Sequence, residues 1–315
     1  MSLRSLNRRR EEAGPTRPKR SRPRLADLAG RQPIGIALAA PYAVFLAAVF
    51  AYPLGLAVWM SFHDYFFAAP GVEVERPFVG LENYRDVLGD DDVRQSFLNV
   101  VEFLLINVPL TVVLALVLAA ALNGAIRGRT FLRLSYFAPY VTASVALVAV
   151  WLFLFSQGGM VNELLGPLAP DPSWLVNSTL AMPVIALFVT WKQLGFFVLL
   201  YLAALQNVPK ELYESAATDG AGRLGAFWHV TVPGVRTATT LVVILATITG
   251  ANLFTEPYLL TNGGGPNGAS SSPVLVMYQK GIEQGNPDTA SAIGVVLVIG
   301  VLLISLVNRR LLERD

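Results

Sequence analysis

The sequence predicts an all-α membrane protein, a polytopic bundle of six transmembrane helices. Of its 315 residues, 54% are hydrophobic and only 15% are charged, whereas a soluble domain ordinarily carries about 25% charged residues. Six predominantly apolar stretches are each long enough to cross a hydrocarbon core about 30 Å thick at a rise of about 1.5 Å per residue. None shows the alternation of a barrel strand, and backbone groups in lipid must be satisfied within their own segment, so these stretches are expected to be helices.

The six predicted spans cover residues 34–60, 97–122, 132–155, 179–205, 237–260 and 288–307. The first follows a basic segment and therefore resembles a signal peptide at first sight. It is long enough to span the bilayer, and it starts too far from Met1 for a signal sequence. We therefore expect it to remain in the protein as the first span.

The distribution of Lys and Arg predicts that both termini are cytoplasmic. Nineteen of the 24 basic residues fall in the N-terminal tail, in and beside the 123–131 turn, in the 206–236 loop and at the C-terminus. Cytoplasmic loops of membrane proteins are enriched in Lys and Arg. The expected orientation is therefore N-in and C-in.

Residues 1–31 form a basic tail with 10 Lys and Arg against 3 acidic residues, and they are rich in proline. Such a composition is too polar to bury a core, so we expect a disordered cytoplasmic tail beside anionic lipid. Nucleic-acid binding is the alternative interpretation, and we expect no nucleic-acid partner. Residues 32–315 then form one membrane domain.

The sequence argues against an enzyme. It has no cysteine, which excludes disulfides, thiolate metal ligands and a cysteine nucleophile. His63 and His229 stand alone, so neither a metal site nor a catalytic residue is expected. No Gly-x4-Gly-Lys-Ser/Thr loop is present, so any ATP-driven step requires an ATPase in a partner.

The most informative segment is the inward loop at residues 206–236. Pro209 favours the first turn of a helix, and Glu211 and Glu214 suit the positive N-terminal end of its dipole. Gly220 suits a left-handed C-terminal stop. We therefore expect a short helix of two or three turns outside the membrane.

Small side chains suit this short helix to docking. Ala216 and Ala217 permit the close approach of another protein surface. A second amphipathic segment, with Leu224, Phe227 and Val230 at helical spacing, can pack the short helix against the membrane domain.

The same loop resembles the "EAA" coupling loop of binding-protein-dependent ABC importer permeases. The residues that carry the resemblance are Glu214, Ala216, Ala217, Asp219, Gly220, Ala221, Phe227, Val230 and Pro233. The resemblance implies that this loop, Glu211 included, fits a groove on a partner ATPase. Val230 and Val232 stand where Ile and Leu are usual. The alternative is an ordinary interfacial helix between two spans.

Other stretches resemble the carbohydrate branch of this family, which includes maltose and glycerol-phosphate permeases. Phe78–Tyr84 resembles its "FVGLxNY" segment and Leu260–Pro266 its "LTxGGP" loop, whereas Asp288–Ala292 departs from the usual Gly-x-Ala-x-Ala start of the last span. The resemblance implies import of a sugar, oligosaccharide or polyol phosphate delivered by an extracytoplasmic binding protein. Which carbohydrate is carried stays open.

The resemblance also implies the partners. A second permease, more often a sister chain than a copy, would pair with this one in the bacterial inner membrane, and a dimer of ATPase subunits would use ATP-Mg, with no cofactor in this chain. The alternative function is a stand-alone secondary carrier or channel for a small polar solute. A carrier should show inverted repeats and interrupted helices in matching halves, and we find neither in the sequence.

Polar residues within spans are costly, so they mark candidates for a translocation path. The candidates, with one aromatic neighbour, are Asn107, Lys192, Gln193, Asn252, Phe254 and Glu256. Asn252 is favoured as a path-lining residue, because an amide beside an aromatic ring suits a hydroxylated cargo.

Three of these candidates also have structural interpretations. Asn107 lies beside Pro109 and can satisfy a carbonyl freed by the proline kink. Lys192 can snorkel, or it can pair with a neighbouring helix. Glu256 lies near the outer end of its span, where solvation is the favoured interpretation.

Overall fold

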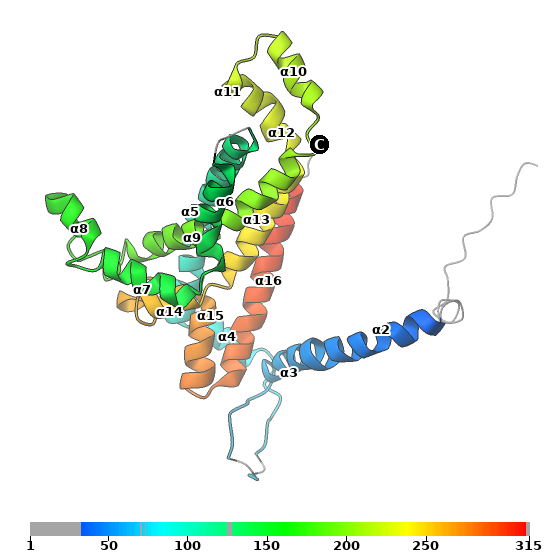
Figure 1. The fold of residues 1–315 in the computed structure, drawn as a ribbon. Helices are drawn as coiled ribbons and strands as arrows, with labels where there is room; N and C mark the ends of the chain where they lie inside the picture. Colours follow the sequence, from blue (N-terminus) through cyan, green and yellow to red (C-terminus); the bar gives the residue numbers. More distant parts are fainter. Residues whose placement is uncertain (1–32, 70, 73, 125–127, 313–315) are drawn as a thin grey trace, which may run out of the picture. The chain divides into compact units, whose positions relative to one another are not determined.

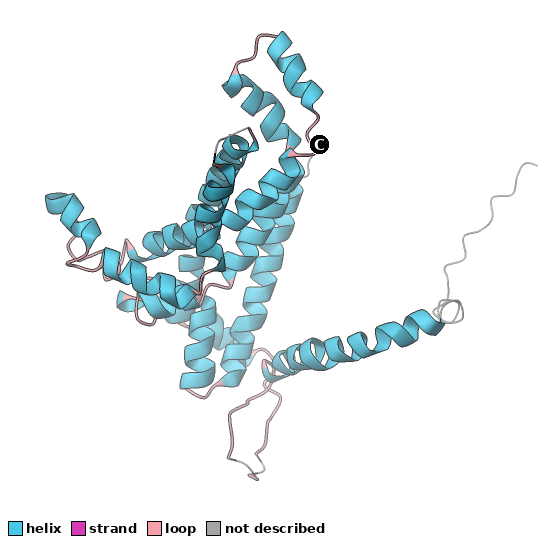
Figure 2. Ribbon diagram, in the orientation of Figure 1, coloured by secondary structure: helices cyan, strands magenta, loops and turns pink. Residues whose placement is uncertain are grey.

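The computed structural model describes residues 33–69, 71–72, 74–124 and 128–312. The predicted tail at residues 1–31 lies outside the described residues. Within the described part, all regular elements are helices, apart from one isolated bridge between His63 and Phe78 (Figure 2). The all-α prediction is therefore confirmed. The chain divides into two compact units, Met1–Leu56 and Ala57–Asp315, which are described separately.

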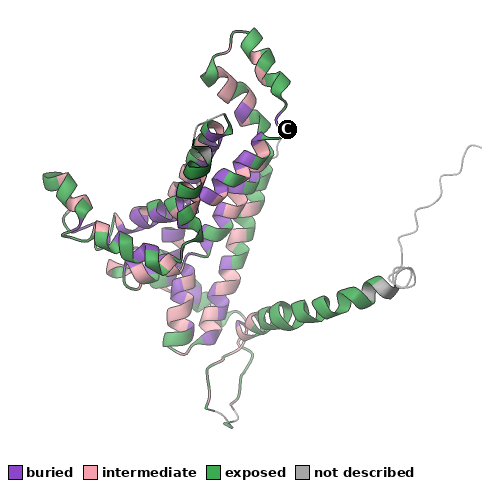
Figure 3. Cartoon of the chain, in the orientation of Figure 1, coloured by how far each residue is buried: buried purple, intermediate pink, exposed green. Residues whose placement is uncertain are grey.

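The described part of the first unit is one nearly continuous apolar helix. It consists of α2 (Pro33–Leu46), the π-turn η1 (Ala47–Ala51) and the start of α3 (Tyr52–Met60). All side chains from residue 37 to residue 56 are exposed (Figure 3). A helix that is apolar and exposed all round suits lipid or another protein chain as its surroundings.

The second unit contains the remaining helices (Figure 1), which are α4 (Glu82–Gly89), α5 (Asp91–Asn123), α6 (Arg129–Val141), α7 (Ser144–Phe155), α8 (Met160–Leu165), η2 (Gly166–Leu168), α9 (Ala181–Leu205), α10 (Lys210–Thr218), α11 (Arg223–Ala226), η3 (Phe227–Thr231), α12 (Val232–Gly234), α13 (Arg236–Ala251), α14 (Thr255–Leu260), η4 (Pro266–Gly268), α15 (Pro273–Tyr278), η5 (Gln279–Glu283) and α16 (Pro287–Leu312). The long helices α5 and α9 pack along each other, and α13 packs against both α5 and α16. Helices α10 and α11 lie at one end of this unit, beyond the ends of the long helices (Figure 1).

Five described helical segments are long and apolar enough to cross a membrane: Ala37–Met60, Asp91–Asn123, Ser144–Leu168, Ala181–Leu205 and Pro287–Arg310. Two further helical segments, Arg223–Gly234 and Arg236–Ala251, meet at a bend of 69°. If these two segments count as one span, the number of candidate spans is six. The predicted number of spans is therefore reached only with this bent pair. The N-in and C-in orientation stays a prediction.

Two predicted spans are interrupted, which the sequence analysis did not foresee. The span predicted at 132–155 breaks at Thr142 and Ala143, whose backbones are extended. Pro139 lies in the turn before this break, where proline cannot donate a backbone hydrogen bond. The span predicted at 237–260 stops at Ala251 and resumes at Thr255. The described chain therefore contains interrupted helices, which the sequence had not shown.

Asn252 binds the last turn of α13 through both its backbone and its side chain. Its backbone N–H donates to the carbonyl oxygen of Ile248 at 3.3 Å, and its side-chain Nδ2 donates to the same oxygen at 2.7 Å. The side chain therefore adds a second hydrogen bond to the end of α13. Irregular backbone at membrane depth is tolerated where it is buried in protein or lines a polar cavity.

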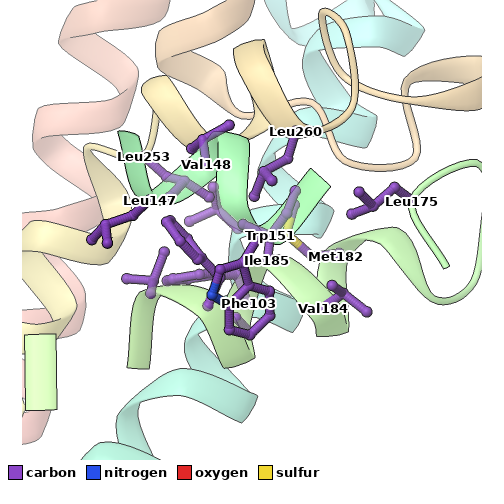
Figure 4. Packing of buried hydrophobic residues seen from close by; sticks show 14 of the residues in the cluster. Phe103, Leu147, Val148, Trp151, Leu175, Met182, Val184, Ile185, Leu253 and Leu260 are labelled. Carbon is purple, nitrogen blue, oxygen red and sulfur yellow. The ribbon is translucent and has the colours of Figure 1, made fainter. Parts of the chain in front are cut away.

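The core of the second unit is built on α9. Phe103, Trp151, Ile185 and Phe188 belong to one buried cluster that joins α9 to α5, α7 and α14 (Figure 4). A second cluster around Tyr201 joins the other end of α9 to α5 and α13. The two clusters fix α9 at the centre of this unit.

Candidate functional site

Helix α10 is the short extramembrane helix expected from the 206–236 loop. It starts at Lys210, and Pro209 precedes it at the capping position rather than within the first turn. Glu211 lies in the first turn, as expected, and is exposed together with Glu214. The carboxylate of Glu211 therefore lies at the positive end of the helix dipole, whereas Glu214 lies in the middle of the helix.

The C-terminal end of α10 confirms the predicted role of Gly220. Gly220 has φ +80°. Its N–H donates to the carbonyl oxygen of Ala217 at 3.1 Å, and the N–H of Ala221 donates to that of Ala216 at 2.8 Å. This pair of bonds is the Schellman motif, which requires a left-handed residue at the position of Gly220.

Tyr213 attaches α10 to the rest of the unit. Tyr213 shares a hydrogen bond with Thr231 at 3.1 Å between the hydroxyl oxygens, and its ring packs on the cluster around Tyr201. A cavity of about 420 Å³, lined in part by Asn123 and Gln206, lies between α10 and the ends of α5 and α9. Helix α10 therefore stands away from the long helices.

The second amphipathic segment was predicted only in part. Phe227 and Val230 are half-buried and pack on the same cluster as Tyr213. Leu224, however, is 72% exposed, so its predicted packing is wrong. The backbone changes from α-helix to π-helix at Phe227.

The predicted coupling residues therefore separate into two sets. The inward set holds the loop together and is half-buried: Ala216, Ala221, Phe227 and Val230. The outward set is exposed: Glu211, Glu214, Ala217, Asp219, Gly220 and Pro233 (Figure 3). An exposed surface with small and acidic side chains on a firmly capped helix is available to a partner protein.

A second candidate region is a cavity of about 340 Å³ beside the two helix breaks. Five of the six predicted path candidates line it: Lys192, Gln193, Asn252, Phe254 and Glu256. Three hydroxyl-bearing residues of the same wall were not predicted from the sequence: Ser144, Thr249 and Thr255. A hydroxyl in an apolar run gives no strong signal in sequence, because it often bonds to its own helix.

The charged residues of this cavity form an ion pair. Lys192 Nζ lies 2.7 Å from Glu256 Oε1 and donates to Ser144 Oγ at 2.7 Å. The side chains of Lys192 and Glu256 are only 15% and 8% exposed. The interpretation that Lys192 pairs with a neighbouring helix is therefore confirmed, and the expected solvation of Glu256 is wrong. The break before α14 brings Glu256 against α9.

Asn107 lies outside the cavity. Its Nδ2 donates to Thr190 Oγ1 at 2.8 Å, and both residues are buried. The Thr190 hydroxyl in turn donates to the carbonyl oxygen of Ala186. Asn107 thus joins α5 to α9, and neither path lining nor capture of a carbonyl freed by Pro109 describes its contacts.

The segment Phe78–Tyr84, which resembles "FVGLxNY", is held by the amide of Asn83 and the hydroxyl group of Tyr84. Asn83 Nδ2 donates to the carbonyl oxygens of Ser61 and His63 at 3.1 and 3.0 Å. The hydroxyl groups of Tyr84 and Ser61 lie 2.6 Å apart. These contacts attach the chain after α3 to α4.

An ion pair also connects α5 to η5 at this end. Lys280 Nζ lies 2.5 Å from Asp90 Oδ2, and Asp90 Oδ1 accepts from the N–H of Val93 as the cap of α5. Burial raises the pKa of Asp90, but the hydrogen bonds from Lys280 and Val93 and the charge of Lys280 lower it by more. The pKa of Asp90 is therefore below its usual value.

Among the residues that the structure describes, no cluster of three or more His, Cys, Asp and Glu side chains is suited to hold a metal ion. The coupling loop offers a surface, and the cavity offers amides, hydroxyls and an aromatic ring.

Comparisons with known proteins find relatives among bacterial ABC transporter permeases. The chain is 32% identical over 277 residues to the probable ABC transporter permease YurN of Bacillus subtilis, covering 86% of this chain and 92% of YurN. It is 30% identical over 279 residues to the arabinooligosaccharide transport permease AraP of the same organism, covering 86% of each. A bacterial alginate ABC transporter solved with an alginate-bound periplasmic protein matches with TM-score 0.76 at 19% identity, covering 93% of this chain and all of that one.

The family model that describes the binding-protein-dependent transport system inner membrane component matches residues 93–315. This match includes α10 and the whole cavity wall. It confirms the resemblance found in the sequence and argues against a stand-alone carrier or channel. The chain therefore belongs to the family of inner-membrane permease components of binding-protein-dependent transport systems.

Proposed function

We propose that this permease imports a carbohydrate that an extracytoplasmic binding protein delivers, and that an ATPase dimer docked on α10 drives the import. The observation that carries the proposal is α10 itself, an exposed helix closed by a left-handed Gly220 and attached through Tyr213. Nothing in the sequence supplies a P-loop, so ATP-Mg would bind to the partner subunits.

The attachment of α10 suits the transmission of movement. A push on the exposed face with Glu211, Glu214 and Ala217 would act through Tyr213 on Thr231, which precedes α12 and α13. Helix α13 packs on α5, α9 and α16. A rigid-body displacement of α10 would therefore reach the central helices, as expected for alternating access.

The cavity supports a carbohydrate as the cargo. The side chains of Gln193 and Asn252 and the hydroxyls of Thr249 and Thr255 suit sugar hydroxyl groups, and Phe254 offers an apolar face. The names of the relatives agree, since AraP is a permease for arabinooligosaccharides and the solved transporter carries alginate. A second permease, more often a sister chain than a copy, would supply the opposite wall, and the apolar helix at residues 37–56 is available for such contacts.

Uptake measurements in cells that lack this chain test the proposal. Labelled oligosaccharides and polyol phosphates would be supplied after complementation with the wild type, Glu214→Arg or Gly220→Val. We expect wild type to restore uptake of one substrate and both variants to reduce it at least tenfold at equal membrane levels. Gly222→Ala is the control, because Gly222 has φ −70° and open space around its Cβ position.

Two results would contradict the proposal. Normal uptake with Glu214→Arg and Gly220→Val would exclude coupling through α10. Restored uptake of an unrelated solute, with no change for any carbohydrate in the panel, would exclude the proposed cargo class.

A further inference from the structure

The amine of Lys192 lies beside the first residues of α7 and α14, where the two interrupted helices resume. Ser144 is the first residue of α7, directly after the break at Thr142 and Ala143. Glu256 is the second residue of α14, after the break at residues 252–254. Lys192, from the uninterrupted α9, contacts both side chains at 2.7 Å. We call Lys192, Ser144 and Glu256 the ion-pair cluster.

The ion-pair cluster leaves Lys192 little freedom. Its ammonium group also lies 5.8 Å from the centre of the Phe188 ring, one turn earlier on α9, which is within the range of a cation–π interaction. Phe188 itself is fully buried in the cluster around Trp151. The amine is therefore held by α7, α9 and α14 together, and its charge is satisfied within the chain.

From this geometry we infer that Lys192 is a positioning residue, which fixes the resumption points of α7 and α14 and thereby sets the shape of the cavity wall. The inference rests on the proposed function and adds a role for Lys192 that differs from cargo binding. The helical hydrogen bonds stop at each break, so they do not set the direction in which the next helix runs. A side-chain contact at the break can set that direction. Cargo would then contact the neighbouring Gln193, Asn252 and Thr255.

An exchange of the two charges separates positioning from cargo binding. In Lys192→Glu/Glu256→Lys, a carboxylate on α9 would face an ammonium group on α14, and the Ser144 hydroxyl could donate where it now accepts. Positioning depends on the pair and survives this exchange. Direct binding of cargo by the Lys192 amine does not survive it.

The first measurement is the initial rate of carbohydrate uptake against concentration. We expect Lys192→Gln and Glu256→Gln to lower the maximal rate at least tenfold. The exchanged pair should recover to within about threefold of wild type, with KM within twofold. Lys192→Arg keeps the positive charge and a side chain of similar length, so its maximal rate should also stay within threefold of wild type. The control is Arg94→Met, which removes an ion pair with Asp91 whose side chains are 65% and 95% exposed.

The second measurement does not depend on the cargo. Because the chain has no cysteine, Thr255→Cys provides a single thiol at the first residue of α14. The rate at which this thiol reacts with a charged maleimide reports the position of α14. We expect Lys192→Gln to change this rate at least threefold and the exchanged pair to restore it.

The two measurements keep the inference and the proposed function apart. Failure of wild type to transport any carbohydrate would contradict the proposed function, while the thiol measurement would still test the ion-pair cluster. Unchanged thiol reactivity in Lys192→Gln would overturn the inference. So would equal loss of uptake in Lys192→Arg and Lys192→Gln at normal membrane levels.

Discussion

The crossing of α6 over α9 depends on the absence of a side chain at Gly195. A Cβ atom built on Gly195 would lie 2.5 Å from the carbonyl oxygen of Tyr136 and 2.7 Å from the Cα atom of Phe137. Both neighbours are backbone atoms of α6, so no rotamer change can relieve the contact. Small residues at such crossings let helix backbones approach closely in membranes.

Gly195→Ala should therefore destabilise the protein. Overpacking costs about 1 to 3 kcal/mol, and contact with a backbone places this site at the upper end. Alanine regains up to about 1 kcal/mol of helix propensity, so the net loss is roughly 2 kcal/mol. At about 2 to 4 °C per kcal/mol, we expect Tm to fall by about 4 to 8 °C.

The assay is thermal unfolding of the purified protein in detergent, followed by near-ultraviolet circular dichroism. Gly300→Ala in α16 is the matched control, because no atom lies within 4 Å of its Cβ position, and its Tm should stay constant or rise. If Gly195→Ala behaves like Gly300→Ala, the close approach of α6 and α9 is refuted.

Two further predictions concern single contacts. Asn107→Leu removes the donor to the buried Thr190 hydroxyl and should lower the free energy of unfolding by about 1 to 3 kcal/mol. The double variant with Thr190→Val should lose less than the sum of the two single effects, measured by denaturant unfolding. Strict additivity of the two effects would contradict the contact. Lys280→Met removes the partner that lowers the pKa of Asp90. A carboxyl group whose pKa is lowered by folding stabilises the folded protein at pH values above its unfolded-state pKa of about 3.9. This stabilisation is lost as the pH falls through the folded-state pKa. The Tm difference between wild type and Lys280→Met should therefore be largest near pH 7 and shrink below about pH 4; a constant difference would contradict it.

Local signals explain what the sequence could predict. Hydropathy located the spans because the transfer of an apolar run into lipid depends on that run alone. The stop at Gly220 was predictable because a left-handed residue closes a helix through bonds to its own last turn. The exposed face of α10 that we propose as the docking surface contains some of the same residues.

Contacts between distant segments explain what the sequence could not predict. The break at Thr142 and Ala143 contains neither glycine nor proline, and the break at residues 252–254 also lacks both. Lys192 and Glu256 are 64 residues apart, and their pairing depends on the second break. Thr190, the partner of Asn107, is an ordinary residue within an apolar run. Tertiary packing decides which side chains pair in these contacts, and no local pattern signals the pairing, although Pro139 marks the turn before the first break.

The proposed function requires that this chain carries cargo only when an ATPase acts on α10. The most direct test is accumulation of labelled carbohydrate in proteoliposomes that contain this chain, the proposed second permease and the proposed ATPase subunits, with the binding protein supplied at the extracytoplasmic face. We predict accumulation that requires both ATP and the binding protein and that Glu214→Arg abolishes. Accumulation driven by a proton or sodium gradient without ATP would contradict the account.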